Sequence, residues 1–192
     1  MVSRIRDRAT YEDLVAVPEN MVAELIEGDL YASPRPAGPH TVAASSLGAL
    51  LMPPFQFGKG GGPGGWWILD EPEVHFAHDV LVPDLGGWRR ERMPEIPRDH
   101  IFSIAPDWVC EVISPSSKRV DRMRKMPIYA RNGVSYAWIL DPLEHLLEVR
   151  RQHEGQWVLV ADYGDGEPVR VAPFEEVEID LSLIWGPPLV AE

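Results

Sequence analysis

The chain has very little cysteine and no long uninterrupted apolar run. Its single cysteine, Cys110, cannot form an internal disulfide, and its place in an apolar stretch predicts a small buried side chain. No apolar run approaches the ~20 residues of a membrane-spanning helix, and residues 1–8 are polar without an apolar signal core. These absences exclude a disulfide-stapled scaffold, and we expect a cytoplasmic protein with no membrane partner.

Basic residues are also scarce. The chain has 18 Lys and Arg against 30 Asp and Glu, a net charge of −12, which argues against a broad nucleic-acid-binding surface. The charge is uneven, however: residues 118–131 contain six basic residues and one acid, whereas residues 162–180 contain seven acids and one arginine. Because a local basic surface is enough to contact phosphates, the net charge does not exclude a nucleic-acid partner.

Composition and length favour a globular domain. Hydrophobic residues make up 45% of the chain and charged residues 25%, which is typical of a globular protein. A chain of 192 residues suits one domain with a real core. We therefore predict a single domain over residues 1–192, with its core at about residues 22–142.

The pattern of apolar residues predicts a mixed fold. We expect strands at 21–26, 30–32, 66–69, 73–76, 80–83, 108–113, 136–140, 146–150 and 156–161, and helices at 11–17, 40–52 and 120–131. Residues 88–106 are interpreted as a charged crossing loop. The order of elements between residues 66 and 140 predicts an α/β (α+β) fold: a mixed central sheet flanked by helices, with extra N- and C-terminal strands.

Two carboxylates interrupt the predicted buried strands. Asp84 ends the run 80–84, and Glu111 lies inside the run 108–113. A lone buried carboxylate is costly and is normally neutralised, hydrogen-bonded or bound to a cation. On neighbouring strands the two could hold Mg²⁺ or Mn²⁺ together with the backbone carbonyl of Val112, and such a site acts on phosphates. The structural alternatives are that Asp84 caps the following loop and that Glu111 pairs with an arginine.

A third group of candidates lies on the predicted helix. Asp121, Lys125 and Tyr129 recur at four-residue intervals and so share one face. A lysine beside a metal would orient the attacking water or stabilise developing negative charge, and Lys125 is the candidate. A surface ion pair between Asp121 and Lys125 is the alternative. Pro127 predicts a kink or a late helix start, because its nitrogen cannot donate to the carbonyl of Met123.

Several stretches together resemble one family. They are Pro83-Asp84, Glu111–Ser117 (EVISPSS), Asp121–Val134 (DRxxKxxxYAxxGV), Tyr136–Pro142 (YxWILDP) and, nearer the N-terminus, Glu24–Leu30 (ELIEGDL), Ser33-Pro34 and His40. Over roughly residues 10–160 the chain resembles the Uma-type family of putative endonucleases, within the restriction-endonuclease-like PD-(D/E)XK superfamily. The block from 111 to 142 is long, ordered and specific.

This resemblance implies a restriction-endonuclease-like core and a metal-dependent nuclease site. By the superfamily pattern, Asp84 and Glu111 would be metal ligands, Glu27 a further acid, and His40 a residue of the same cleft. The sequence departs from the pattern where a lysine is expected two residues after Glu111, because that residue is Ile113. The family commonly has a lysine on the following helix, which implies that Lys125 takes this role.

Two functions remain open on the sequence. The first is a Mg²⁺- or Mn²⁺-dependent endonuclease that hydrolyses DNA, acting as a homodimer because two strands need two cuts. The second is a catalytically degenerate module that binds nucleic acid or another protein on the same fold. The second rests on Ile113, on the net charge of −12, and on four tryptophans as candidate surface residues, Trp66, Trp67, Trp88 and Trp185. For Glu27 and His40 the alternatives are a turn acid and a helix-start histidine.

Overall fold

Two β-sheets form the framework of the computed structural model, which describes residues 1–36, 38–166 and 168–185. Sheet A has the strand order β1-β3-β2-β6-β5-β8, and sheet B has the order β12-β11-β10-β9-β7-β4. The strands of sheet A are β1 (Ser3–Arg6), β2 (Met21–Ile26), β3 (Asp29–Pro34), β5 (Glu73–Phe76), β6 (Asp79–Leu81) and β8 (Ile101–Phe102). Those of sheet B are β4 (Trp66–Asp70), β7 (Leu85–Arg89), β9 (Trp108–Val112), β10 (Tyr136–Asp141), β11 (Leu146–His153) and β12 (Gln156–Tyr163).

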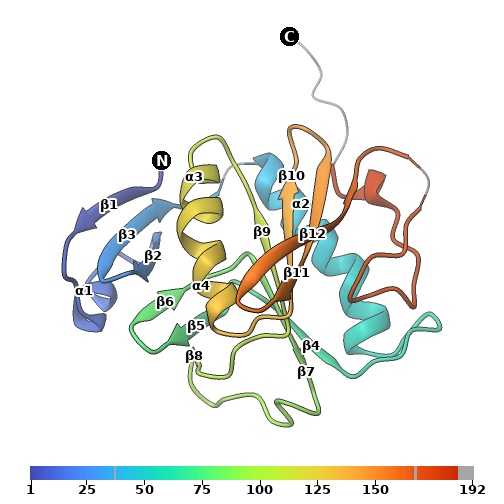
Figure 1. The fold of residues 1–192 in the computed structure, drawn as a ribbon, viewed down its shortest axis with the longest axis horizontal. Coiled ribbons are helices and arrows are strands. Elements are labelled where there is room, and N and C mark those ends of the chain that lie inside the picture. Colours follow the sequence, from blue (N-terminus) through green and yellow to red (C-terminus); the bar gives the residue numbers. More distant parts are fainter. Residues whose placement is uncertain (37, 167, 186–192) are drawn as a thin grey trace.

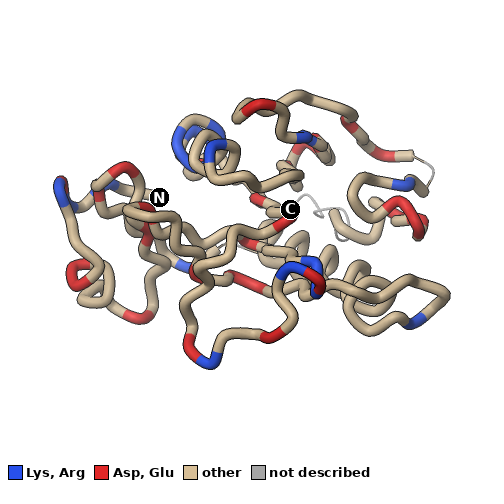
Figure 2. The backbone as a smooth tube through the Cα atoms, turned by 60° about the horizontal axis from the view of Figure 1, so that its bottom comes forward, with Lys and Arg blue, Asp and Glu red and all other residues tan. Residues whose placement is uncertain are grey.

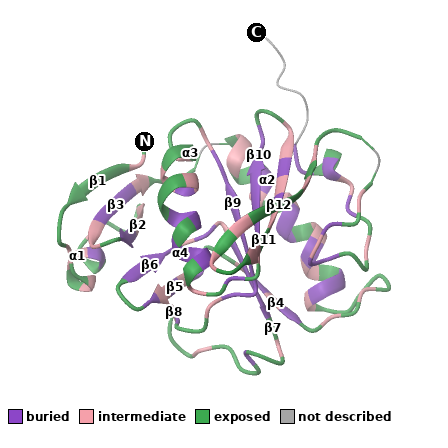
Figure 3. Cartoon of the chain, viewed as in Figure 1, coloured by how far each residue is buried: buried purple, intermediate pink, exposed green. Residues whose placement is uncertain are grey.

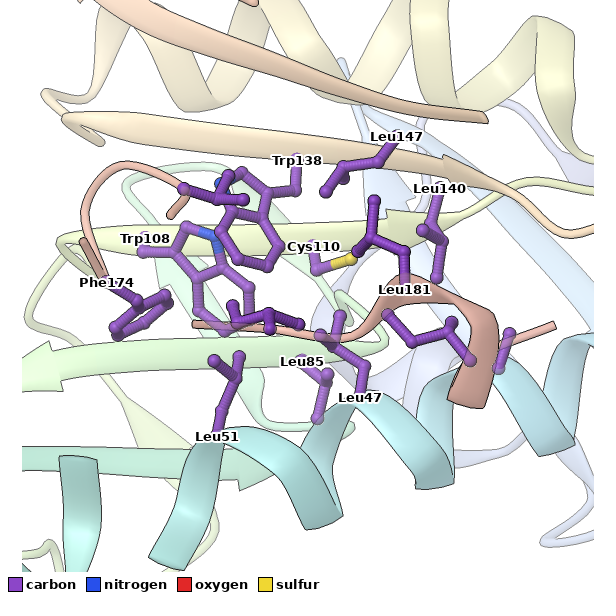
Figure 4. Close-up of a cluster of buried hydrophobic side chains, with 14 of the residues drawn as sticks. Leu47, Leu51, Leu85, Trp108, Cys110, Trp138, Leu140, Leu147, Phe174 and Leu181 are labelled. Carbon is purple, nitrogen blue, oxygen red and sulfur yellow. The ribbon is translucent and has the colours of Figure 1, made fainter. Parts of the chain in front are cut away.

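Sheet B is covered by a helix on each face (Figure 1). Alternate residues of a strand point to opposite faces, so the buried strand β9 serves two cores. Trp108 and Cys110 pack in the cluster that contains Leu47 and Leu51 of α2 (Gly38–Leu51), as Figure 4 shows. Val109 packs in the cluster that contains the residues of α4 (Met126–Arg131). Glu111, two residues beyond Val109, therefore lies on the α4 face.

The segment between β9 and β10 is the predicted crossover helix. It consists of α3 (Lys118–Val120), a π-helical turn (η2, Asp121–Lys125) and α4, and it connects two parallel strands. The π-helical turn ends two residues before Pro127, whose missing N–H leaves a carbonyl of the preceding turn without its helical partner. The helical segment thus has an irregular turn near the proline where a kink or a late start was predicted. Gly133 follows α4 with a φ of +81°, a conformation that glycine adopts without steric cost.

The N-terminal strands form sheet A beside this helix. β2 and β3 make a hairpin whose turn residues Glu27 and Gly28 have positive φ angles of 54° and 83°. The turn and both strands were predicted, as was α1 (Tyr11–Val15), which Thr10 caps. The outer strand β1 was not predicted, because its residues are exposed and alternate in no apolar pattern.

One strand assignment was wrong and matters for the site. The run 80–83 was expected beside Glu111 in one sheet, but β6 belongs to sheet A, and β7, which was not predicted, pairs with β9 through Leu85 and Cys110. Two adjacent glycines in β7 hide the strand from sequence reasoning. A Cβ at Gly87 would lie 2.9 Å from the Trp108 ring, so close packing explains the glycine. Asp84 consequently lies where the chain passes from sheet A to sheet B.

The expectation of surface tryptophans was also wrong. Trp66, Trp88 and Trp185 are buried and Trp67 is half-buried, so the four tryptophans do not form an exposed patch. Figure 3 shows the buried residues concentrated in the central strands of sheet B, and the prediction of a buried Cys110 is confirmed. Across the described ranges no helix combines the length and the apolar character needed to cross a membrane.

Candidate functional site

The α4 face of sheet B carries a buried glutamate, Glu111. Its side chain is only 3% exposed. The Tyr129 hydroxyl of α4 donates to Oε1 of Glu111 at 2.6 Å, and Lys125 Nζ lies 2.9 Å from the same oxygen and 3.0 Å from Oε2. Burial raises the pKa of Glu111 well above its ordinary value, since Lys125 only partly offsets the desolvation.

Lys125 is the centre of the ion-pair cluster. Its side chain is 3% exposed, and its ammonium group donates to the backbone carbonyl of Val82 at 3.1 Å and lies 2.8 Å from Oε1 of Glu24 on β2. Burial lowers the pKa of Lys125, but the charges of Glu111 and Glu24 outweigh that effect and hold it well above its ordinary value. The lysine is therefore charged, and it joins the helix to both sheets.

Asp84 closes the opposite side of the site. Its Oδ2 accepts a hydrogen bond from the backbone N–H of Val112 at 2.7 Å, which ties it to the residue that follows Glu111. Its Oδ1 lies 3.2 Å from Nε2 of His40 at the start of α2. Burial lowers the pKa of His40, but Asp84 outweighs this and the net shift is upward. The Nδ1 atom of His40 is buried and has no hydrogen-bond partner among the described residues.

Asp121 adds a fourth carboxylate. It is the buried first residue of the π-helical turn, and its Oδ1 lies 4.0 Å from Lys125 Nζ. Burial raises the pKa of Asp121 to about 6, against the lowering effects of Lys125 and of the hydrogen bond from Ser117. The geometry thus places Asp121 in the interior, not in the surface ion pair that the sequence also allowed.

These side chains line one cavity of about 400 Å³. Its wall includes all the residues of the acidic cluster, namely Glu24, Asp84, Glu111 and Asp121, together with Lys125, His40 and Val112. Four carboxylates face one lysine, so the cluster holds a surplus of negative charge. Burial is the main cause of the raised pKa values of Glu111 and Asp121, and the neighbouring carboxylates raise them further.

The donor set suits a hard divalent cation. Mg²⁺ and Mn²⁺ prefer oxygen ligands, and Mg²⁺ usually keeps several waters and takes only one or two carboxylates. Asp84, Glu111 and the Val112 carbonyl could supply the protein oxygens, and the cation would offset the surplus charge. Within the described ranges, no group of three or more His, Cys, Asp or Glu side chains has the arrangement of a metal centre. Water or substrate oxygens would therefore have to complete the coordination.

The structure brings together most of the predicted site residues, but not Glu27. Asp84, Glu111, Lys125, Asp121, Tyr129 and His40 all belong to the cluster described above. Glu27 lies instead at the tip of the β2–β3 hairpin and pairs with Arg124 at 2.6 Å. Strand geometry accounts for the difference, because Glu24 is inside β2, where a side chain can point inward, whereas Glu27 is in the turn.

Sequence reasoning missed Glu24 as a member of the site. Its Oε1 accepts a hydrogen bond from the backbone N–H of Val82 at 2.8 Å in addition to its contact with Lys125. A usable signal was present, since Glu24 is an acid within the apolar strand 21–26. The same reasoning that singled out Glu111 applies to it.

The basic segment 118–131 is largely neutralised by acids from other elements. Figure 2 shows basic and acidic residues interspersed along the chain. Besides Lys125, the pairs are Lys118 with Asp141, Arg122 with Glu148, Arg124 with Glu27, and Arg131 with Asp79. Of the six basic residues, only Arg119 has no acidic partner among the described residues. The expected phosphate-facing surface therefore has little free positive charge.

Comparison with known proteins gives two findings. The family Uma2, described as a putative restriction endonuclease, matches residues 8–183. The chain is also similar to the crystal structure of a putative nuclease belonging to DUF820 from Anabaena variabilis ATCC 29413. That match has a TM-score of 0.68 and 23% sequence identity, and it covers 92% of this chain and 98% of the other. No curated protein matches the chain. The structural likeness confirms the predicted restriction-endonuclease-like α/β fold.

Proposed function

This chain belongs to the Uma2 family of putative restriction endonucleases, and from that premise we propose that it is a Mg²⁺- or Mn²⁺-dependent endonuclease. Its substrate would be DNA, and its reaction the hydrolysis of a phosphodiester bond. The site would be the cavity lined by Asp84, Glu111 and Lys125.

The contact between Lys125 and Glu111 carries the proposal. The superfamily pattern needs a lysine beside the metal-binding glutamate, and the strand offers Ile113 where that lysine is expected. Lys125 Nζ reaches Glu111 at 2.9 Å from the following helix. A lysine that pointed to solvent would have favoured a degenerate site, so the observed contact supports the catalytic alternative.

Each side chain has a role that follows from its position. A divalent cation bound by Asp84, Glu111 and the Val112 carbonyl would polarise the phosphate and lower the pKa of the attacking water. Lys125 supplies a fixed positive charge that can orient that water or stabilise the charge that develops on the phosphate oxygens. Tyr129 and Glu24 hold Glu111 and Lys125 in place.

One argument for the alternative function, a non-catalytic binding module, does not hold. It rested partly on exposed tryptophans, and three of the four are buried. The largely neutralised basic segment still fits a weak nucleic-acid binder. The homodimer, the single-domain organisation and the cytoplasmic location stay predictions.

Cleavage assays with matched variants test the proposal. Labelled DNA would be incubated with wild type, Asp84→Asn and Glu111→Gln in Mg²⁺, in Mn²⁺ and in EDTA. We expect metal-dependent cleavage by wild type and a loss of at least about 100-fold in each variant. Glu148→Gln, on the same sheet but outside the cavity, is the control and should cleave like wild type. No cleavage in either metal, with DNA affinity unchanged in Asp84→Asn, would favour the module instead.

A further inference from the structure

The shape of the cavity restricts what can reach its acids. Its volume of about 400 Å³ lies within the range of small-molecule sites, roughly 300–1,000 Å³. Glu111 and Lys125 are each only 3% exposed, and Asp84 is 17% exposed. A phosphate must therefore enter the cavity to meet them.

The lining of the cavity fits a base and sugar as well as a phosphate. Apolar side chains form much of the wall, among them Val22, Ile113 and Leu143. The wall also includes five prolines, three of which are close together in the sequence: Pro34, Pro36, Pro39, Pro115 and Pro142. Because proline has a fixed φ angle, these segments are stiff and the entrance has limited freedom to widen. An unstacked base could pack against such a surface.

Free positive charge around the cavity is sparse. Among the described residues its lining contains two Lys or Arg side chains, Arg35 and Lys125, and both are paired with acids, Arg35 with Glu71 at 2.6 Å. The one lining histidine, His40, contacts Asp84. Of the other basic residues in segment 118–131, only Arg119 lacks an acidic partner among the described residues. A duplex-binding protein commonly neutralises about 6–10 phosphates with Lys and Arg. The described surface near the site offers far fewer free cations than that.

We propose that the cavity accepts a short single-stranded segment of nucleic acid and that continuous duplex binds it poorly. The inference rests on the proposed function, since it names the substrate class of the same site. A frayed end, a flap or an unpaired strand can insert one or two nucleotides into the recess. The phosphate then meets the acidic cluster and its cation, and the base packs on the apolar wall. A stacked, paired strand would first have to unpair and unstack, and this cost weakens its binding.

Fluorescence anisotropy with two matched probes tests the proposal. One probe is a fluorescein-labelled 12-nucleotide single strand, and the other is the same strand annealed to its complement. Titration of the wild-type chain in Ca²⁺ separates binding from cleavage. We expect the single strand to bind at least about 10-fold more tightly than the duplex. Equal or tighter binding of the duplex, or no binding of either probe, would overturn the proposal.

The salt dependence of the same titration gives a second readout. The slope of log K against log salt is about −0.7 for each phosphate neutralised on a single strand. Contact with one or two phosphates therefore predicts a slope between about −0.7 and −1.4. A slope steeper than about −4 would mean a long electrostatic footprint and would contradict insertion into a small cavity.

Cavity-filling variants locate the binding. Ser33→Phe puts a large side chain on the wall, and Ser116→Trp does so at an exposed position of the rim where folding is tolerant. Each should weaken single-strand binding at least about 10-fold. Gln156→Phe adds a similar side chain to β12 outside the cavity and should change nothing. Wild-type affinity in both Ser33→Phe and Ser116→Trp would overturn the proposal.

Cleavage of the same probes separates this inference from the proposed function. If the single strand binds in the cavity but is not cut in Mg²⁺ or Mn²⁺, the substrate class stands and the nuclease proposal fails. If duplex is bound and cut in preference, the nuclease proposal stands and the single-strand inference fails.

Discussion

Glu111 and Glu148 occupy the same row of sheet B and have opposite electrostatic surroundings. Ile139 of β10 pairs with Glu111 of β9 on one side and with Glu148 of β11 on the other. The three side chains therefore share the face that the helical segment 118–131 covers. Each glutamate also meets a basic residue of that segment, Lys125 for Glu111 and Arg122 for Glu148.

The difference lies in which charge is in excess. Glu148 accepts from Arg122 and Arg150, and these hydrogen bonds lower its pKa to about 2. Glu111 shares one lysine with three other acids in a cavity, and burial raises its pKa well above the ordinary value. The first arrangement satisfies its glutamate and stabilises the fold. The second leaves negative charge uncompensated, which is what a site for a cation needs.

The largest effect should come from removing the lysine. Lys125→Met takes away the ammonium group that lies among the four acids, so we expect activity to fall by at least about 100-fold. Breaking a buried ion pair should also lower the free energy of unfolding by about 3–5 kcal/mol. Urea unfolding and cleavage rates measure both. Arg122→Met, in the same helical segment, should lower stability by less and leave the cleavage rate unchanged. A similar loss of activity in Arg122→Met would contradict the distinction between the Lys125–Glu111 and Arg122–Glu148 pairs.

Neutralising the two glutamates one at a time should have opposite consequences for cleavage and for stability. Glu111→Gln should abolish cleavage while changing the free energy of unfolding by less than about 1 kcal/mol, because Lys125 keeps Glu24 and Asp121 as charged partners and the amide oxygen still accepts from Tyr129. Glu148→Gln should cost up to about 1 kcal/mol of stability and preserve cleavage. Chemical denaturation beside activity assays tests both variants. If Glu111→Gln were the more destabilising of the two, the buried acid would be structural.

The pH dependence of stability should have opposite signs in the two regions. The folded pKa of Glu148 is below its ordinary value, so its contribution is present above about pH 4.5 and is lost as the pH falls toward 2. The folded pKa of Asp121 is raised to about 6, so its contribution is present below about pH 4 and is lost as the pH rises through 6. Urea unfolding in EDTA checks both signs.

Two variants test whether Glu148 and Asp121 cause these two pH dependences of stability. The stability gap between wild type and Glu148→Gln should shrink as the pH is lowered from 5 toward 3. Asp121→Asn should gain stability relative to wild type as the pH is raised from 4 to 7. A gap that is constant with pH in either variant would show that the group does not titrate as described.

The smallest effect should be at Glu27. This residue pairs with Arg124 at an exposed turn and lies outside the cavity. We expect Glu27→Ala to lower the free energy of unfolding by no more than about 1 kcal/mol and to change cleavage less than about twofold. Glu24→Gln provides the contrast, since Glu24 contacts Lys125 and its loss should slow cleavage markedly. Equal effects of the two variants would put Glu27 back among the site residues.

Sequence reasoning reached the fold class and most of the cluster because the signals were local. Carboxylates inside apolar strands marked Asp84 and Glu111, and four-residue spacing placed Lys125 and Tyr129 on one helix face. It failed where tertiary packing decides. β7 was missed because its two glycines, which are unfavourable in a strand, are explained only by the tryptophan rings packed closely against them.

The partners of the charged residues could not be read from the chain either. Arg124 and Arg131 meet Glu27 and Asp79 only because sheet A folds against the helix. The basic run therefore predicted a phosphate-facing surface that the fold largely neutralises.

Calorimetric titration of Mn²⁺ into the chain tests the central claim most directly, because it needs no substrate. Wild type should show saturable binding, Glu148→Gln should bind equally, and Asp84→Asn should show none. That result would establish the acidic cavity as a divalent-cation site. Absence of binding to wild type, or binding that persists in Asp84→Asn, would contradict the account of the surplus charge around Glu111.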